Sequence, residues 1–444
     1  MTLNRDATAA RTHRLKLALF TSLAGKGVST VVQLVALPLA IGALGQERFG
    51  VYAMLAALLN WMSIASVTIT PGLTVQLVKA NVEMDHARER KIFGSSLVFS
   101  AGLACLLCLG IQLGIHEVGL ERLFGATYFA FADELQSGVF VLAVLLAMNI
   151  ALSVADGAQA GYQNQYIHNL FLSIGNVVTI LAIAFLVRAR PTIAHMIIAV
   201  YAAPIAARAL SLIQLLWSRK YLMAGLMQID FPTLRLIAAT GSSFLLTNVA
   251  SFCYQSFSVY WVGRNLGPLA AAQASVFIIV LGVSGSLLTM FTQPLWPAIQ
   301  DATVRNDAAW VHRAYTRISK HLMAGFGIAA VIIALAGNNI VHIWIKSAIA
   351  PAGATQILLG FYLVLLAWEH LNYSFLIGLG YYWFASLSYL SGALIMMVNS
   401  LWLVALFGVA GMLAAMCSGP LLVTAWIYPI KLKRLFVAPR ATGA

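Results

Sequence analysis

Long apolar stretches alternate with short polar segments along the whole chain. A stretch of about 20 mainly apolar residues is long enough to cross the hydrocarbon core of a bilayer as a helix. We therefore expect an all-α, polytopic membrane protein that consists almost entirely of its membrane-spanning part. The pattern predicts twelve helices, with approximate bounds 17–44, 51–78, 92–115, 138–160, 169–187, 193–217, 236–261, 268–298, 321–345, 354–378, 384–406 and 408–430.

A basic segment connects the first six predicted helices to the last six. It predicts an N-terminal lobe over residues 1–217, a cytoplasmic linker over 218–235 and a C-terminal lobe over 236–444. The two halves also resemble each other, because the first helix of each ends in Leu-Gly and the next helix contains a proline. This arrangement is typical of transporters built from two repeats. The matching residues are Leu44-Gly45 with Pro71, and Leu266-Gly267 with Pro294.

The composition and the distribution of charge exclude several classes of protein. The 444 residues are 61% hydrophobic and only 9% charged, whereas soluble domains contain about 25% charged residues. This excludes an ordinary soluble enzyme, a disordered chain and a secreted disulfide-bonded domain. Of the Lys and Arg residues outside the helices, 19 lie on the same side as the N-terminus and six on the other side. The positive-inside rule places both termini in the cytoplasm and explains the net charge of +13 without nucleic acid.

Catalytic signatures are missing from the sequence. It contains no HExxH, GxSxG or Walker A pattern, so we expect neither an enzyme nor an ATPase. The four cysteines lie inside apolar runs and the nine histidines are scattered, so we expect no metal and no cofactor. Any transport must then be driven by an ion gradient, by the gradient of the substrate or by its later consumption.

Five charged residues lie inside the predicted helices or at their edges. A charge in the membrane costs at least about 2.5 kcal/mol unless it is paired, hydrated or able to reach the surface. Lys26, Arg208 and Glu369 lie nine residues from the cytoplasmic ends of their predicted helices, and Asp156 lies four residues from such an end. Arg264 lies near the opposite side.

Two interpretations of these charges are open. In the first, Lys26, Arg208 and Arg264 bind an anionic ligand in a water-filled central cavity, while Glu369 and Asp156 supply counter-charge or bind a coupling ion. In the second, the long cationic side chains reach the membrane surface, or pair with the carboxylates and hold the helices together.

Three segments resemble the oligosaccharide flippases, which form the polysaccharide transporter branch of the multidrug/oligosaccharidyl-lipid/polysaccharide (MOP) superfamily. Residues 293–302 read QPLWPAIQDA and are followed by Asp307 and Trp310, similar to the motifs LWPA-x-x-(D/E)-A and D-x-x-W. Residues 38–52 resemble the P-L … LG-x-E-x-(F/Y)-G-x-(W/Y) hairpin, and residues 156–164 resemble a G-x-Q-x-G-Y segment. Residues 372–380 depart from the family, in which many members have an L-N-G-x-G turn.

The resemblance implies two six-helix lobes around a central cavity and a flippase of the inner membrane. Such a protein moves undecaprenyl-diphosphate-linked oligosaccharide outward by alternating access, for O-antigen, capsule or exopolysaccharide assembly. The implied partners are this substrate, membrane lipid, a polysaccharide polymerase with other assembly proteins, and a coupling proton or sodium ion. Lys26 and Arg208 would bind the diphosphate. The prolines Pro71, Pro294 and Pro297 would act as hinges, or alternatively form static kinks.

Two other functions are open. An ion-coupled multidrug exporter of the same superfamily would favour an acidic cavity for organic cations, whereas the deep charges here are two cations and two anions before Arg264 is counted. An integral-membrane polymerase or glycosyltransferase would need a large outer loop, whereas the longest outer connection covers only residues 116–138.

Overall fold

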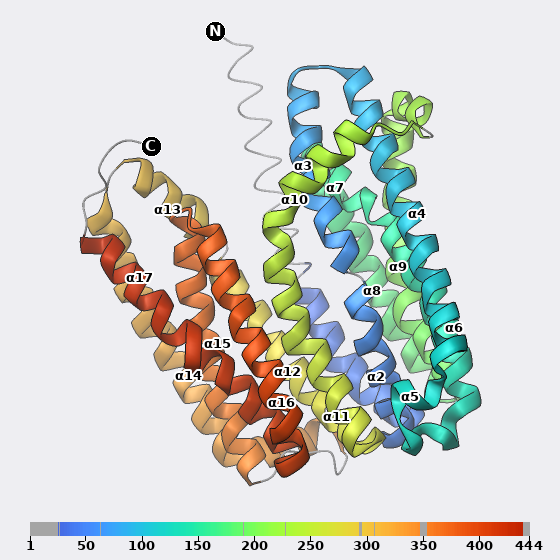
Figure 1. The fold of residues 1–444 in the computed structure, drawn as a ribbon, viewed down its shortest axis with the longest axis vertical. Coiled ribbons are helices and arrows are strands. Elements are labelled where there is room, and N and C mark those ends of the chain that lie inside the picture. The colour runs from blue at the N-terminus through green and yellow to red at the C-terminus, as the bar shows by residue number, and fades with distance from the viewer. Residues whose placement is uncertain are drawn as a thin grey trace. The chain divides into compact units, whose positions relative to one another are not determined.

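The described part of the chain folds into helices joined by short connections. The computed structural model describes residues 25, 27–62, 64–189, 191–226, 228–292, 295–305, 307–346 and 353–437. Within these ranges every regular element is a helix and there is no strand (Figure 1). Contacts divide the chain into two compact units, residues 1–245 and 246–444. The boundary lies inside helix α10, beyond the 218–235 segment.

The first unit contains helices that run back and forth, joined by short connections. Its elements are a first helix over Gly27–Leu44, α2 (Gln46–Met62), α3 (Ile64–Val82), α4 (His86–Val118), α5 (Leu120–Phe124), η1 (Ala126–Phe131), α6 (Ala132–Leu152), α7 (Val154–Gly161), α8 (Gln165–Leu186), α9 (Ile193–Ser218), η2 (Lys220–Gly225) and the first part of α10 (Phe231–Phe252).

The second unit begins within α10 and continues to the C-terminal helix. Its further elements are η3 (Cys253–Phe257), α11 (Ser258–Leu266), α12 (Pro268–Thr292), α13 (Leu295–Val304), α14 (Ala308–Ile345), α15 (Ala354–Gly378), α16 (Tyr382–Gly419), η4 (Pro420–Thr424) and α17 (Ala425–Val437). The elements η3 and η4 are single π-helical turns within otherwise α-helical segments.

The described helices account for the predicted membrane spans. Nine are long and apolar enough to cross a bilayer, or ten when the bent pair within 231–266 is counted. One of the nine, Tyr382–Phe436, turns back at Gly408, whose φ of 61° favours glycine. The two arms lie side by side, since the Tyr428 hydroxyl donates to the Ala385 carbonyl over 2.7 Å. With these arms counted separately, and with α2–α3 as one more segment, the described residues agree with the predicted twelve.

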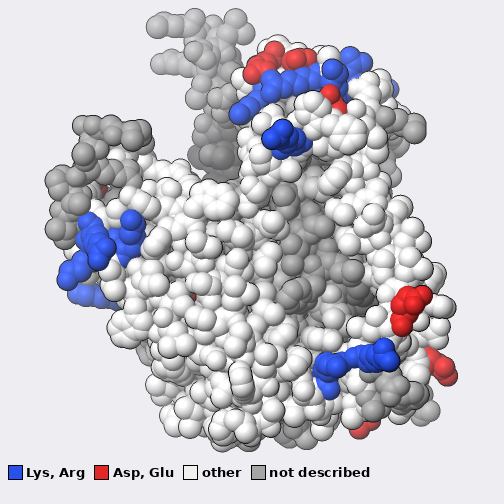
Figure 2. Space-filling view, viewed as in Figure 1, with Lys and Arg blue, Asp and Glu red and all other residues white. Residues whose placement is uncertain are grey.

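The surface of each unit is apolar between its ends. In Figure 2 the Lys and Arg side chains gather near helix ends, and broad uncharged surfaces lie between them. Many large apolar side chains are exposed there, including Phe185, Leu335 and Leu406. A soluble protein would bury such residues, so this surface is suited to contact with lipid.

Close packing between α3 and α7 fixes the position of α7. A Cβ added at Gly157 would lie 2.8 Å from the Thr70 carbonyl oxygen, and one added at Gly161 would lie 2.9 Å from the Leu77 Cβ. The Thr74 hydroxyl also donates to the Gly157 carbonyl over 3.0 Å. Small residues four positions apart let two membrane helices approach in this way.

The segment after α9 is docked onto the first unit around a buried carboxylate. Glu89, in the first turn of α4, accepts hydrogen bonds from the hydroxyls of Tyr162, over 2.9 Å, and of Tyr221. The Arg219 guanidinium lies 3.7 Å from the centre of the Tyr162 ring and donates to the Tyr221 hydroxyl over 2.8 Å. Burial, reinforced by the hydrogen bond to Glu89, raises the pKa of Tyr221, so its hydroxyl stays a neutral donor. The segment is thus held in place.

The first part of α10 is attached to the same unit. The backbone N–H of Asp230 donates to the Ser95 hydroxyl over 2.9 Å, and the Asp230 side chain accepts from the Thr233 N–H over 3.0 Å at the start of α10. About two turns beyond Thr233, Gln76 of α3 donates to the Thr240 hydroxyl over 3.3 Å. These contacts explain why the unit boundary falls within α10.

The segment that resembles the LWPA motif has a structural role in the second unit. It forms α13, whose Ile299 packs so closely on Gly378 of α15 that a Cβ added there would lie 2.9 Å from the Ile299 Cβ. The Asp307 side chain accepts from the Trp310 N–H over 2.9 Å and caps the start of α14. The motif residues Asp307 and Trp310 therefore mark a helix start.

Candidate functional site

A polar face runs along the α6–α7 segment of the first unit. Asn149, Ser153 and Asp156 follow each other at spacings of four and three, so they lie on one side of this nearly continuous helix. The helix is interrupted at Ser153, whose hydroxyl donates to the Ile150 carbonyl over 2.7 Å. The interruption separates α6 from α7, whose first turn carries Asp156.

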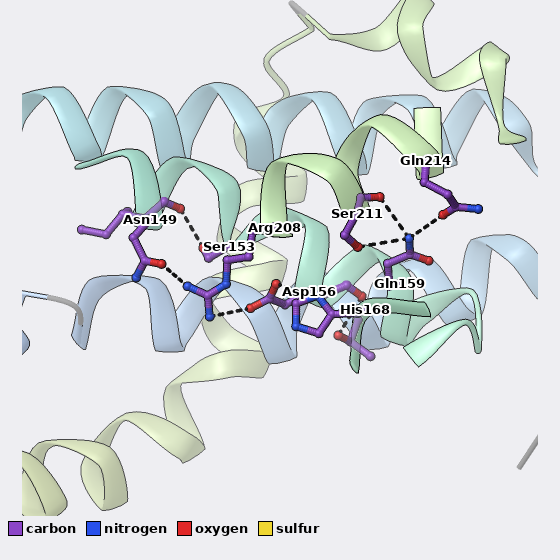
Figure 3. Close-up of polar contacts among 11 residues, drawn as sticks. Asn149, Ser153, Asp156, Gln159, His168, Arg208, Ser211 and Gln214 are labelled. Carbon is purple, nitrogen blue, oxygen red and sulfur yellow. Dashed lines mark hydrogen bonds and ion pairs between the residues drawn. The ribbon is translucent and has the colours of Figure 1, made fainter. Parts of the chain in front are cut away.

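Arg208 of α9 connects the two ends of this polar face. Its Nη2 lies 3.0 Å from the Asp156 Oδ2, and its Nη1 donates to the Asn149 Oδ1 (Figure 3). Only 23% of the arginine side chain and 18% of the aspartate side chain are exposed. The structure thus brings together two of the residues that the sequence singles out. The predicted helix ends placed Asp156 closer to the membrane surface than Arg208. The two side chains nevertheless meet, because α9 continues for more residues beyond Arg208 than α7 does beyond Asp156.

His168 of α8 completes the cluster from the other side of Asp156. Its Nδ1 lies 3.3 Å from the Asp156 Oδ1, and 6% of its side chain is exposed. The carboxylate therefore has the guanidinium against one oxygen and the imidazole against the other, as Figure 3 shows. We call Asn149, Asp156, His168 and Arg208 the Arg208 cluster.

Several polar atoms of the Arg208 cluster have no hydrogen-bond partner in the described part of the chain. They are the Nε of Arg208, the Oδ1 of Asp156 and the Nδ1 of His168, all of them buried. A buried polar atom without a partner is costly, so a cluster that retains three is suited to receive water or a polar ligand.

A second polar contact lies one turn further along α7. Gln159 is fully buried and its Nε2 donates to the Gln214 Oε1 over 2.9 Å and to the Ser211 carbonyl over 3.1 Å (Figure 3). These bonds join α7 to α9 and set the register at which Arg208 faces Asp156. In the segment that resembles G-x-Q-x-G-Y, the Gln and Gly residues therefore support the cluster.

Glu369 lies in the second unit and is considered separately. It belongs to α15, is 4% exposed, and its Oε1 accepts a hydrogen bond from the hydroxyl of Thr424 in the π-helical turn η4. Tyr254, Tyr362 and Tyr389 are close enough to the carboxylate to interact with it electrostatically. In the described part of the chain no Lys or Arg forms an ion pair with Glu369, and its carboxylate is stabilised by the hydrogen bond from Thr424.

The remaining predicted residues are placed differently. Lys26 and Pro294 lie outside the described residues. Pro71 lies inside α3, which continues without interruption, and Pro297 belongs to α13. Arg264 is exposed in the last turn of α11, a position in which a cation interacts favourably with the helix dipole.

Sequence reasoning missed Asn149 and His168. The signal for Asn149 was its spacing from Asp156, which puts two polar residues seven positions apart on one face of an apolar helix. His168 carried no such signal, because its approach to Asp156 depends on how α8 packs against α7. Within the described ranges no group of three or more His, Cys, Asp or Glu residues could hold a metal ion.

An apolar cavity of about 270 Å³ lies elsewhere in the first unit, among α2, α4, α5 and α6. Its lining residues include Leu55, Ile111, Phe124 and Val139, with Gly110 and Gly114 in α4. Its lining is almost entirely apolar, so it suits hydrocarbon. It therefore offers nothing to a charged ligand, and the Arg208 cluster remains the candidate site for one.

Comparisons with known proteins identify the fold. No family model matches the chain. An inward-facing structure of a multidrug resistance MATE family transporter of the MOP superfamily gives a TM-score of 0.79 at 13% identity, over 94% of this chain and 96% of that one. The chain has the fold of MOP superfamily transporters. An outward-facing structure of such a transporter gives 0.62 at 12% identity, over 94% and 97% of the two chains.

Two further similarities bear on the function of this MOP-fold protein. A curated Salmonella typhi protein named "Putative O-antigen transporter" is 23% identical over 292 residues, and the match spans 64% of each protein. A MOP superfamily transporter from Pyrococcus furiosus, described as having a binding pocket of reverse polarity that suggests a different function, gives a TM-score of 0.60 at 15% identity, over 97% and 96% of the two chains. The protein is thus a multi-pass membrane protein with the fold of transporters.

Proposed function

We propose that the protein is a flippase that moves undecaprenyl-diphosphate-linked oligosaccharide across the inner membrane for surface polysaccharide assembly. The observation that carries the proposal is the half-buried guanidinium of Arg208, held by Asp156 and Asn149, with a buried Nε that has no partner in the described part of the chain. Guanidinium groups bind phosphate oxygens through paired, charge-assisted hydrogen bonds. The similarity to the Salmonella typhi protein supports the same class of substrate.

In this proposal the diphosphate is loaded from the cytoplasm. The bias of 19 to six Lys and Arg residues favours cytoplasmic termini. The diphosphate then displaces Asp156 from Arg208, so that Asp156 acts as the counter-charge of the empty site. Lys26 contributes a second cation, Arg264 a third near the outer side, and the prolines Pro71, Pro294 and Pro297 allow helices to bend during alternating access.

Glu369 is the proposed coupling residue. A buried carboxylate that has hydroxyl groups around it can bind a proton or a sodium ion, and its charge state would then change with the ion gradient. A polymerase and other assembly proteins are expected to receive the flipped oligosaccharide.

A second candidate is an ion-coupled multidrug exporter. It is favoured by the fold similarity to multidrug resistance transporters. The two candidates differ in the charge of the substrate, which is an anion for the flippase and an organic cation for the exporter. A site for organic cations requires acidic groups that are not paired with a cation, whereas in the Arg208 cluster Asp156 is paired with a guanidinium.

Deletion of the gene tests the proposal. The expected result is loss of surface polysaccharide, with lipid-linked oligosaccharide accumulating on the cytoplasmic leaflet. The wild-type gene should restore export, Arg208→Ala should not, and Arg313→Ala, which removes an exposed arginine of α14, should. Normal polysaccharide after deletion, together with greater sensitivity to cationic drugs, would instead support the exporter.

A further inference from the structure

Asp156 is placed so that it can exchange one cationic partner for another. Its Oδ2 is bound by Arg208 over 3.0 Å, and its Oδ1 lies 3.3 Å from the His168 Nδ1 with no hydrogen bond formed. The three groups come from three helices, α7, α8 and α9. An imidazole can gain a proton near neutral pH and then becomes a cation that donates from both ring nitrogens.

The first state of this arrangement is the empty site. Arg208 already balances the charge of Asp156, so a proton on His168 would add a second cation beside the guanidinium. Asp156 and Arg208 are the charged groups that interact with His168 in the described part of the chain, one from each of the packed helices α7 and α9. His168 is therefore neutral while Arg208 and Asp156 are paired.

The second state arises when an anion occupies Arg208. The anion removes the guanidinium from Asp156 and leaves a carboxylate that is only 18% exposed without its partner, which is unfavourable. The anion also screens the positive charge that opposed a proton on His168. Both changes favour a protonated His168, whose Nδ1–H can donate to the unpartnered Asp156 Oδ1.

We propose that His168 is a proton-binding site coupled to the anion site: each diphosphate bound at Arg208 is accompanied by one proton taken up at His168, which replaces the guanidinium as partner of Asp156. The inference rests on the proposed function, since it requires that Arg208 receives a diphosphate. Its consequence is that the loaded cluster carries one compensating positive charge that the empty cluster lacks. His168 acts here as a positioning residue, because it holds Asp156 and does not contact the substrate.

The test is a count of protons during binding. Purified protein in detergent is titrated with a short-chain polyprenyl diphosphate in two buffers that differ in ionisation enthalpy, at pH 7.5. The dependence of the heat on the buffer gives the number of protons taken up. The diphosphate changes its own protonation, so the informative quantity is the difference between wild type and variants. We expect wild type to take up about one proton more than His168→Gln. Relative to that variant, the affinity of wild type should therefore fall about tenfold for each unit by which the pH is raised.

Two further variants make the result independent of the His168 substitution. Asp156→Asn keeps the imidazole but removes the carboxylate that would stabilise its proton. On binding the diphosphate, this variant should therefore also take up about one proton fewer than wild type. His116→Gln, a change at an exposed histidine of α4, should take up as many protons as wild type. If wild type binds the diphosphate with the same proton count as His168→Gln and Asp156→Asn, the inference is overturned while the anion site stands. If wild type binds no diphosphate, the anion site and the inference both fail.

Discussion

Replacing Asp156 by Asn should strengthen diphosphate binding, because it removes the group that competes with the substrate for Arg208. The two side chains are 3.0 Å apart, and two unit charges at this distance attract each other by about 5–6 kcal/mol at an effective dielectric constant of 20. Loss of hydration offsets part of this, and a hydrogen bond between charged groups contributes about 1.5–3 kcal/mol net.

The expected gain in affinity follows from that net value. Each 1.4 kcal/mol corresponds to a factor of ten, so Asp156→Asn should bind a polyprenyl diphosphate about ten- to a hundredfold more tightly than wild type at a pH high enough that His168 takes up no proton. The same substitution leaves Arg208 without its counter-charge in the empty protein, so the thermal unfolding midpoint should fall and the diphosphate should restore it.

Isothermal titration calorimetry measures the affinity, and a thermal unfolding scan with and without the diphosphate measures the stability. Asp133→Asn is the matched control, since it makes the same chemical change at an exposed residue of α6. An Asp156→Asn protein that is folded and yet binds the diphosphate no more tightly than Asp133→Asn would refute the competition between Asp156 and the substrate.

Three further predictions concern other parts of the molecule. Glu369→Gln should still bind the diphosphate but lose the dependence of flipping on a proton or sodium gradient; an unchanged gradient response in reconstituted vesicles excludes Glu369 as the coupling residue. Gly94→Ala should lower stability by about 1–3 kcal/mol, because the added Cβ overlaps the Gly225 carbonyl, whereas Gly102→Ala has open space and should not; equal thermal midpoints would contradict this. A cysteine introduced at position 125 should react with an impermeant reagent from outside the cell, and labelling from the cytoplasmic side alone would reverse the predicted topology.

The hydrophobic pattern was sufficient to predict the number and position of the membrane helices, because a membrane helix is recognised by its length and apolar composition. The predicted helices 354–378 and 193–217 match α15 and α9 almost to the residue. The hairpin at Gly408 was also visible, since the predicted helices 384–406 and 408–430 meet there. The docking of residues 219–225 on Glu89 could not be predicted, because it depends on contacts between residues far apart in the sequence.

The candidate site was predictable in part. Asp156 and Arg208 stood out because charges are costly in a membrane, and this argument applies to each residue alone. That they pair with each other follows from the register of α7 against α9, which Gln159 and Ser211 set across the interface. The role of His168 depends on the same three-dimensional packing. From the sequence alone, a histidine in an apolar helix that binds a proton looks the same as a histidine that has only a structural role.

We propose that the protein moves a diphosphate-linked oligosaccharide across the membrane by means of Arg208. The most direct measurement uses proteoliposomes loaded with fluorescent undecaprenyl-diphosphate oligosaccharide and follows its arrival in the opposite leaflet by quenching with an impermeant reagent. We predict rapid transfer by wild type and by Arg313→Ala, and transfer at the rate of protein-free vesicles by Arg208→Ala. Transfer by Arg208→Ala at the wild-type rate, or efflux of organic cations by a wild-type protein that leaves the oligosaccharide in place, would contradict it.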